Sequence, residues 1–101
     1  MDLEMILTEN GKEGEIKLKG YLDAGNAAEF EAVVVDAAQK NDPLVLDMEG
    51  LEYVSSAGLR VFKRAYLDMA KKRGTLAAKN VRGNVMDILE MTGFTRMFKL
   101  I

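Results

Sequence analysis

The stretch that most constrains the fold is Leu44–Arg60, with the sequence LVLDMEGLEYVSSAGLR. It begins with Leu44–Met48, a short and almost wholly apolar run that is typical of a strand near the middle of a sheet. Two serines, Ser55 and Ser56, then directly precede a segment whose apolar residues recur at helical spacing. The stretch therefore predicts a central strand, a loop, and the start of a helix.

The N-terminal residues predict a β-hairpin. Apolar and polar side chains alternate over residues 2–8 and again over residues 15–19. Between the two runs lies Asn10-Gly11, a strong hairpin signal because both residues accept a positive φ. In the second run Lys17 and Lys19 point away from Ile16, so one face of that strand should be exposed to solvent.

A first helix is predicted between the hairpin and the central strand. Asp23 is the expected N-cap, and Asn41–Pro43 ends the helix because the residue before proline avoids the α region. The buried stripe of this helix comprises Ala27, Phe30, Val34, Ala37 and Ala38.

Strands and helices continue to alternate after the central strand. A second helix is predicted from about Ala57 to Arg73, and Gly74 ends it. A short strand over Thr75–Ala78 follows, and then a short helix that ends near Gly93. The last residues, 94–101, should include a final short strand.

These elements give the order ββαβαβαβ in a chain of 101 residues, which is about the size of one domain. Right-handed crossovers that keep moving in one direction across a sheet place their helices on one face. We therefore predict a single α/β domain over residues 1–101. Its sheet is mixed and mostly parallel, with four to five strands, an N-terminal β-hairpin, and helices packed on one face.

Composition excludes several classes of function. The chain has no His and no Cys, which removes the usual zinc sites, His-based acid–base catalysis, Ser–His triads and disulfides. A net charge of −2 gives no general drive toward nucleic acid. No apolar run is long enough to span a membrane, and the first ten residues carry acids where a signal peptide carries Lys or Arg. We predict a cytoplasmic protein that is not an enzyme, has no cofactor and does not insert into membranes.

Two motifs are considered and rejected. The segment Gly20–Ala27 has the two-glycine spacing of a phosphate-binding loop, but it has no Lys and no Ser or Thr at the positions that hold phosphate and Mg²⁺. Asp47, Glu49 and Glu52 lie close together in the sequence. No other residue type nearby would complete a metal site, so we predict three solvated acids and no metal.

The two serines allow two interpretations that are compatible with each other. A serine before a helix can be its N-cap, which is worth about 1 kcal/mol. A hydroxyl at a helix N-terminus can also accept a phosphate, because the dipole and the free N–H groups there stabilise an anion. The phosphate would add about −1.5 to −2 charges and considerable bulk to that surface. One serine can cap while the other is modified.

The serine segment resembles the signature of the STAS domain family, whose small bacterial members are anti-sigma factor antagonists. That signature is a strand and a loop, followed by Asp-Ser-Ser/Ala/Thr-Gly-Leu opening a helix. Here Ser55–Leu59 matches it, except that Ser55 takes the place of the acid. The Gly-x-Leu/Ile-Asp loop of the family appears as Gly20–Asp23, and a late Gly-Phe pattern appears as Gly93-Phe94. The resemblance covers essentially the whole chain.

The resemblance implies a partner and a switch. In that family the serine after the acid is phosphorylated by an anti-sigma factor of the serine kinase type. The unmodified form binds that kinase and frees a sigma factor for transcription, and matching makes Ser56 the acceptor. The expected partner-binding residues are Tyr21, Asp23, Ala24, Ser55, Ser56, Gly58, Leu59 and Lys63. A constitutive STAS adaptor subunit of a transporter or signalling assembly, without a serine switch, is the alternative.

Overall fold

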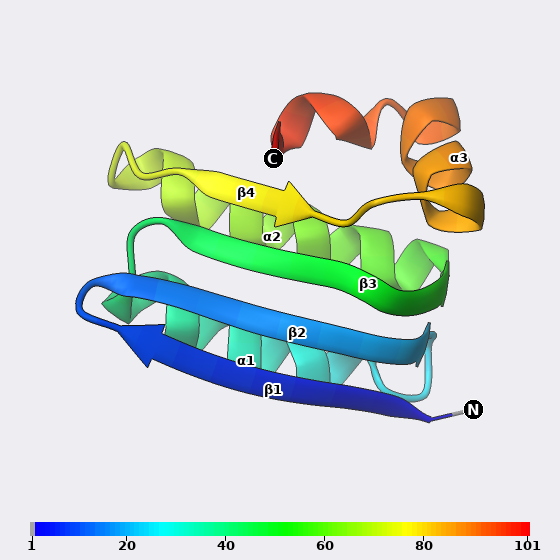
Figure 1. Cartoon of the computed structure of the whole chain (residues 1–101), viewed down its shortest axis with the longest axis horizontal. Helices are drawn as coiled ribbons and strands as arrows, with labels where there is room; N and C mark the ends of the chain where they lie inside the picture. The colour runs from blue at the N-terminus through cyan, green and yellow to red at the C-terminus, as the bar shows by residue number, and fades with distance from the viewer. Residues whose placement is uncertain (1) are drawn as a thin grey trace.

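Five strands form one mixed sheet whose spatial order follows the sequence, β1-β2-β3-β4-β5 (Figure 1). The computed structural model describes residues 2–101. Its strands are β1 (Leu3–Asn10), β2 (Glu13–Leu22), β3 (Leu44–Val54), β4 (Leu76–Lys79) and β5 (Lys99–Leu100). Its helices are α1 (Ala27–Lys40), α2 (Ser56–Lys71), α3 (Gly83–Thr92) and the short 3₁₀ helix η1 (Phe94–Met97). β1 runs antiparallel to β2 and the other neighbours are parallel, so the predicted fold class and element order are confirmed.

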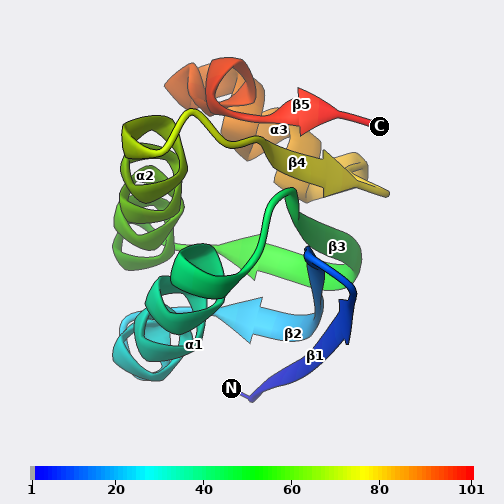
Figure 2. The same cartoon turned by 90° about the vertical axis from the view of Figure 1, so that its left-hand side faces the viewer.

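Helices α1 and α2 lie side by side against one face of the sheet (Figure 2). Each crossover from β2 to β3 and from β3 to β4 moves one strand further in the same direction. Right-handed crossovers of this kind place both helices on the same side, as predicted. Helix α3 follows β4 and lies at the end of the sheet where β4 finishes (Figure 1).

The core lies between this helical layer and the sheet. At its centre Phe62 of α2 is fully buried between Phe30 of α1 and Phe98, which follows η1. The ring centroids are 5.9 Å apart for Phe30 and Phe62 and 5.4 Å apart for Phe62 and Phe98, and both pairs meet edge to face. Edge-to-face packing is a favoured aromatic arrangement, so the three rings tie α1, α2 and the C-terminal segment together.

Strand β3 is longer than predicted. The sequence indicated a strand over Leu44–Met48 and a loop after it, but the strand continues to Val54. It stays extended because β2 continues beside it, pairing Tyr21 with Tyr53 after two shifts of register. Glu49 and Glu52 are exposed side chains on this strand.

Two local predictions are also corrected. The hairpin is confirmed, but its two-residue loop is Gly11-Lys12, one position beyond the predicted pair, and Gly11 has the positive φ of 64°. Helix α1 starts at Ala27 with Asn26 at the N-cap position, and Asp23 is not the cap. Instead Asp23 organises the preceding turn, because its Oδ1 accepts the Gly25 N–H at 2.9 Å.

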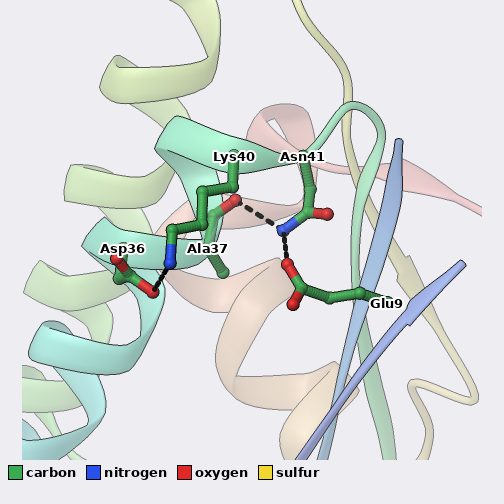
Figure 3. A network of polar contacts seen from close by, with 5 residues as sticks. All are labelled: Glu9, Asp36, Ala37, Lys40 and Asn41. Atoms are coloured by element: carbon green, nitrogen blue, oxygen red, sulfur yellow. Dashed lines mark hydrogen bonds and ion pairs between the residues drawn. The ribbon is translucent and has the colours of Figure 1, made fainter. Parts of the chain in front are cut away.

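The far end of α1 is joined to the hairpin by a buried amide (Figure 3). Asn41 is only 2% exposed, and its Nδ2 donates to Glu9 Oε2 at 2.8 Å and to the Ala37 carbonyl oxygen at 3.0 Å. The nearby Lys40–Asp36 ion pair is 3.1 Å long and exposed. The Asn41 contacts thus fix the tip of β1 against α1.

Candidate functional site

Helix α2 begins directly after β3, and its first turn separates the roles of the two serines. Ser55 is the N-cap: its backbone is extended, and its Oγ accepts the Gly58 N–H at 3.3 Å. Ser56 is the first helical residue and is exposed. Its hydroxyl makes no hydrogen bond with any of the residues 2–101. The hydroxyl that stabilises the helix is therefore distinct from the one that is free to react.

A backbone hydrogen bond brings a second segment to this corner. The Ser55 N–H donates to the carbonyl oxygen of Leu22 at 2.8 Å. Leu22 is the last residue of β2, so the turn that begins at Asp23 lies beside the start of α2. The structure therefore brings together the two segments that the sequence singled out, Gly20–Asp23 and Ser55–Leu59.

The expected partner-binding residues divide by burial. Gly58 is buried so closely that a Cβ there would lie 2.5 Å from Leu22 Cγ, and Leu59 is part of the core. These two residues shape the corner from within: Gly58 packs closely against Leu22, and the Leu59 side chain lies in the core. The expected residues with exposed or half-buried side chains are Tyr21, Asp23, Ala24, Ser55, Ser56 and Lys63.

Sequence reasoning missed Tyr53 as a member of this surface. Tyr53 is 41% exposed, and its ring centroid lies 6.4 Å from that of Tyr21. The two tyrosines are paired across β2 and β3 at the ends of these strands. A signal was present in the sequence, because Tyr21-Leu22-Asp23 and Tyr53-Val54-Ser55 repeat one pattern of tyrosine, buried aliphatic and polar residue.

The two sides of the corner carry opposite charge. On α2 the exposed Arg60 and Lys63 follow Ser56 at helical spacing, and neither forms an ion pair within the described chain, whereas Arg64 is paired with Asp68. On the other side an open hollow of about 750 Å³ adjoins the turn after β2. Four carboxylates line it, those of Asp2, Glu4, Asp23 and Glu29. Ser56 therefore lies where an acidic and a basic surface adjoin.

The acids of β3 do not form a metal site. Glu49 and Glu52 are solvated as predicted, but the prediction was wrong for Asp47, which is only 5% exposed. Asp47 accepts hydrogen bonds from Asn80 Nδ2 at 2.9 Å and from the Glu49 N–H at 3.1 Å. Burial raises the pKa of Asp47, but these hydrogen bonds, with the charges of Lys79 and Lys17, outweigh it and hold the pKa below its ordinary value. Among residues 2–101 no cluster of acids, His or Cys could hold a metal ion.

Comparisons with known proteins identify the family of the chain. The profile of the STAS domain matches residues 4–101, which is nearly the whole chain. The chain belongs to the STAS domain family. Anti-sigma factor antagonists of this STAS type are regulators and not enzymes, as the sequence predicted for this chain.

Individual STAS relatives are named for the same role. BtrV of Bordetella bronchiseptica, which carries the name of an anti-sigma factor antagonist, is 32% identical over 82 residues, covering 80% of this chain and 71% of BtrV. The anti-sigma factor antagonist SpoIIAA in its unphosphorylated form superimposes with a TM-score of 0.84 at 16% identity, over 97% of this chain and 88% of SpoIIAA. The Bacillus cell fate determinant SpoIIAA in its phosphorylated form superimposes with a TM-score of 0.77 at 15% identity, over 97% of this chain and 91% of SpoIIAA. In residues 2–101 of the STAS chain no helix is long and apolar enough to cross a membrane.

The division of roles between the serines predicts unequal effects of alanine substitution. We expect Ser55→Ala to lower the free energy of unfolding by about 1 kcal/mol, because it removes the oxygen that accepts the Gly58 N–H. Ser56→Ala should change it by less than about 0.5 kcal/mol, because that hydroxyl is exposed and makes no hydrogen bond within residues 2–101. Equilibrium unfolding in urea measures both values. A larger loss for Ser56→Ala than for Ser55→Ala would show that the capping assignment is reversed.

Proposed function

We propose that this STAS protein is an anti-sigma factor antagonist whose binding to an anti-sigma factor of the serine kinase type is controlled by phosphorylation of Ser56. The observation that carries the proposal is the free, exposed hydroxyl of Ser56 at the start of α2, beside the Ser55 that caps the helix. The names of the relatives support the partner class. The existence of phosphorylated and unphosphorylated forms of SpoIIAA, which has the same fold, supports the switch.

In its unmodified form the protein docks through the corner described above. Tyr21 and Tyr53 offer half-exposed rings, α2 offers Arg60 and Lys63, and the turn after β2 offers carboxylates. Occupation of the anti-sigma factor by this cytoplasmic protein releases the sigma factor, and transcription that depends on that sigma factor rises. A surface with adjoining acidic and basic parts fixes the orientation of a partner, because the reverse orientation would place like charges opposite each other.

Phosphorylation changes this surface without breaking the fold. The Ser56 Oγ attacks the γ-phosphorus of ATP on the kinase, the bond to the β–γ bridging oxygen breaks, ADP leaves, and a base of the kinase takes the hydroxyl proton. The helix dipole tolerates the added dianion at this position. Arg60 lies four residues further along the same helix face, where it can pair with the phosphate. The partner then meets added bulk, added negative charge and an engaged Arg60.

The replacement of the family acid by Ser55 has a defined physical effect. Serine and aspartate are comparable N-caps, so the start of α2 is preserved. The negative charge next to the acceptor is lost. Asp23 is the one acid in the segments Gly20–Asp23 and Ser55–Leu59, and it follows Leu22, which the Ser55 N–H contacts. Recognition of the acceptor by the kinase therefore relies on Asp23 in this chain.

The decisive experiment mixes the protein with its cognate kinase and ATP and locates the phosphate by mass spectrometry. We expect one phosphate, on Ser56, and none on the Ser56→Ala variant. In calorimetric titrations with the kinase, Ser56→Asp should weaken binding at least about tenfold, or 1.4 kcal/mol. Thr75→Asp is the matched control, since Thr75 is exposed beyond the other end of α2, and it should bind as the unchanged protein does.

The switch would be contradicted if Ser56 is not modified and if Ser56→Asp leaves the affinity for the kinase unchanged. Intact binding under those conditions would favour the adaptor without a switch. Loss of binding in Thr75→Asp as well would point to a general charge effect and would also contradict a site at Ser56.

A further inference from the structure

Strand β1 is a free sheet edge of eight residues, Leu3–Asn10. It pairs with β2 on one side, and no other element of the described chain lies along its other side (Figure 1). The pairing with β2 has no shift of register, and β1 contains no proline and no lysine, which are common protections of an edge. The opposite edge, β5, has only two residues. A long, regular edge of this kind is a template for another strand.

The backbone groups that β1 offers can be assigned residue by residue. The Tyr21 N–H donates to the Asp2 carbonyl oxygen at 3.0 Å, so even-numbered residues of this antiparallel pair are bonded to β2. The odd-numbered residues therefore direct their N–H and C=O groups outward. These residues are Leu3, Met5, Leu7 and Glu9.

The middle of the strand is apolar on both faces. Ile6 is 57% exposed and Leu7 is 39% exposed, and successive side chains of a strand point to opposite faces. Acidic side chains, Glu4 and Glu9, lie toward the two ends. The edge therefore has an exposed apolar centre in addition to its free backbone groups.

We propose that β1 pairs antiparallel with β1 of a second copy of this chain, with the two-fold axis at Ile6. Leu3 then faces Glu9 of the second copy and Met5 faces Leu7, so that every outward N–H and C=O from Leu3 to Glu9 has a partner. Ile6 faces its own symmetry mate in a non-bonded pair, where side chains come closest. A shift of two residues in either direction loses one bonded pair and this isoleucine contact.

The charges are compatible with a second copy in this register. Glu4 lies opposite Thr8 and Glu9 lies opposite Leu3, so no acid faces an acid across the pair. The Glu9 carboxylate is in addition held within its own chain by Asn41 (Figure 3). A shift of four residues toward the N-terminus would place Glu4 opposite Glu4 of the second copy, and direct like-charge pairs across strands are destabilising.

The proposed dimer is a continuous ten-stranded sheet, twice the five strands of one chain. The two halves run in opposite directions, so the two Ser56 corners lie at opposite ends. β2 separates each β1 edge from β3 and α2, so the first turn of α2 and the two tyrosines stay accessible. The acidic hollow, which Leu3 and Glu4 of β1 line in part, borders the dimer seam. A strand pair of this size buries less than a standard interface of about 1,200–2,000 Å², so we expect a reversible, concentration-dependent dimer.

A cross-linking experiment tests the register directly, because the chain has no cysteine of its own. In Ile6→Cys the two thiols would face each other at a Cα separation of roughly 4.5 Å, which a disulfide can bridge. Oxidised glutathione takes the two electrons, and the thiols lose two protons as the bond forms. We expect Ile6→Cys to form the covalent dimer at least tenfold faster than Ile101→Cys, which places a similarly exposed thiol at the other edge.

Sedimentation equilibrium supplies a second, independent measurement. The unchanged protein should dimerise between micromolar and millimolar concentration, and Ile6→Glu should remain monomeric because two acids would meet at the axis. The introduced carboxylate would lie beside Lys17 of β2 in its own chain, so this variant should fold normally. Thr8→Lys, opposite Glu4 of the second copy, should strengthen the dimer.

Two results would overturn the proposal. One is a protein that is monomeric at millimolar concentration, with Ile6→Cys no faster to cross-link than Ile101→Cys. The other is a monomer in which Ile6→Glu weakens binding of the anti-sigma factor, which would assign the edge to that partner. Neither outcome depends on modification of Ser56, so the two proposals fail separately.

Discussion

Replacement of Phe62 by alanine is expected to lower the free energy of unfolding by about 3–5 kcal/mol. Phe62 has no exposed surface, and the rings of Phe30 and Phe98 contact it edge to face. Its removal would leave a cavity lined by residues from α1, α2 and the C-terminal segment. The sheet holds the surrounding elements in place, so they cannot all move to fill this cavity. A loss of this size is a large part of the roughly 5–15 kcal/mol typical of a domain.

Leu67→Ala is the matched control for this prediction. Leu67 lies on the same helix, five residues further along, and is 44% exposed. Its truncation should cost less than about 1 kcal/mol, because the side chain is already largely in water. Urea unfolding monitored by circular dichroism compares the two variants. Equal losses for Phe62→Ala and Leu67→Ala would show that the aromatic cluster does not organise the core.

Replacement of Gly20 by alanine should also be strongly destabilising, by about 2–5 kcal/mol. Gly20 has a φ of 109°, which L-residues rarely adopt, and a Cβ there would overlap the carbonyl oxygen of Asp2. That oxygen accepts the Tyr21 N–H. Alanine therefore brings both backbone strain and displacement of the start of β1 from β2.

Gly83→Ala is the control that separates backbone strain from steric overlap as causes of the lost stability. Gly83 has a positive φ of 58°, but a Cβ there would meet no atom within 4 Å. We expect a loss of about 1–2 kcal/mol from strain alone. Unfolding measurements give both values, and amide hydrogen exchange should show faster exchange in residues 2–5 only for Gly20→Ala. A Gly20→Ala variant as stable as Gly83→Ala would argue against the close approach of Asp2.

Much of the fold could be predicted because local signals and tertiary packing agree. The alternation in the hairpin and the apolar spacing of α1 and α2 led to the correct element order. The length of β3 could not be predicted, because residues after Met48 stay extended only through pairing with β2. The start of α1 was misplaced for a related reason. Asp23 is a good cap by residue type, but its carboxylate is engaged by the Gly25 N–H in a turn that precedes the helix.

The sequence predicted which two segments form the candidate site, but not how each residue of the site is placed. The hydrogen bond between Ser55 and Leu22 joins two segments that only the fold brings together. Neighbouring serines are equally suitable caps by residue type, so the helix start alone determines that Ser55 caps. The burial of Gly58 could not be predicted, because it results from close packing against Leu22, which lies far away in the sequence.

The separation of capping and reactive hydroxyls has a consequence for experiments in living cells. A loss of about 1–2 kcal/mol in stability can change the amount of a protein several-fold, which confounds many phenotypes. Ser56 is exposed and makes no hydrogen bond within residues 2–101, so its variants should accumulate to the same level as the unchanged protein. A growth or reporter phenotype of a Ser56 variant would then reflect signalling, whereas a phenotype of Ser55→Ala would mix signalling with protein loss.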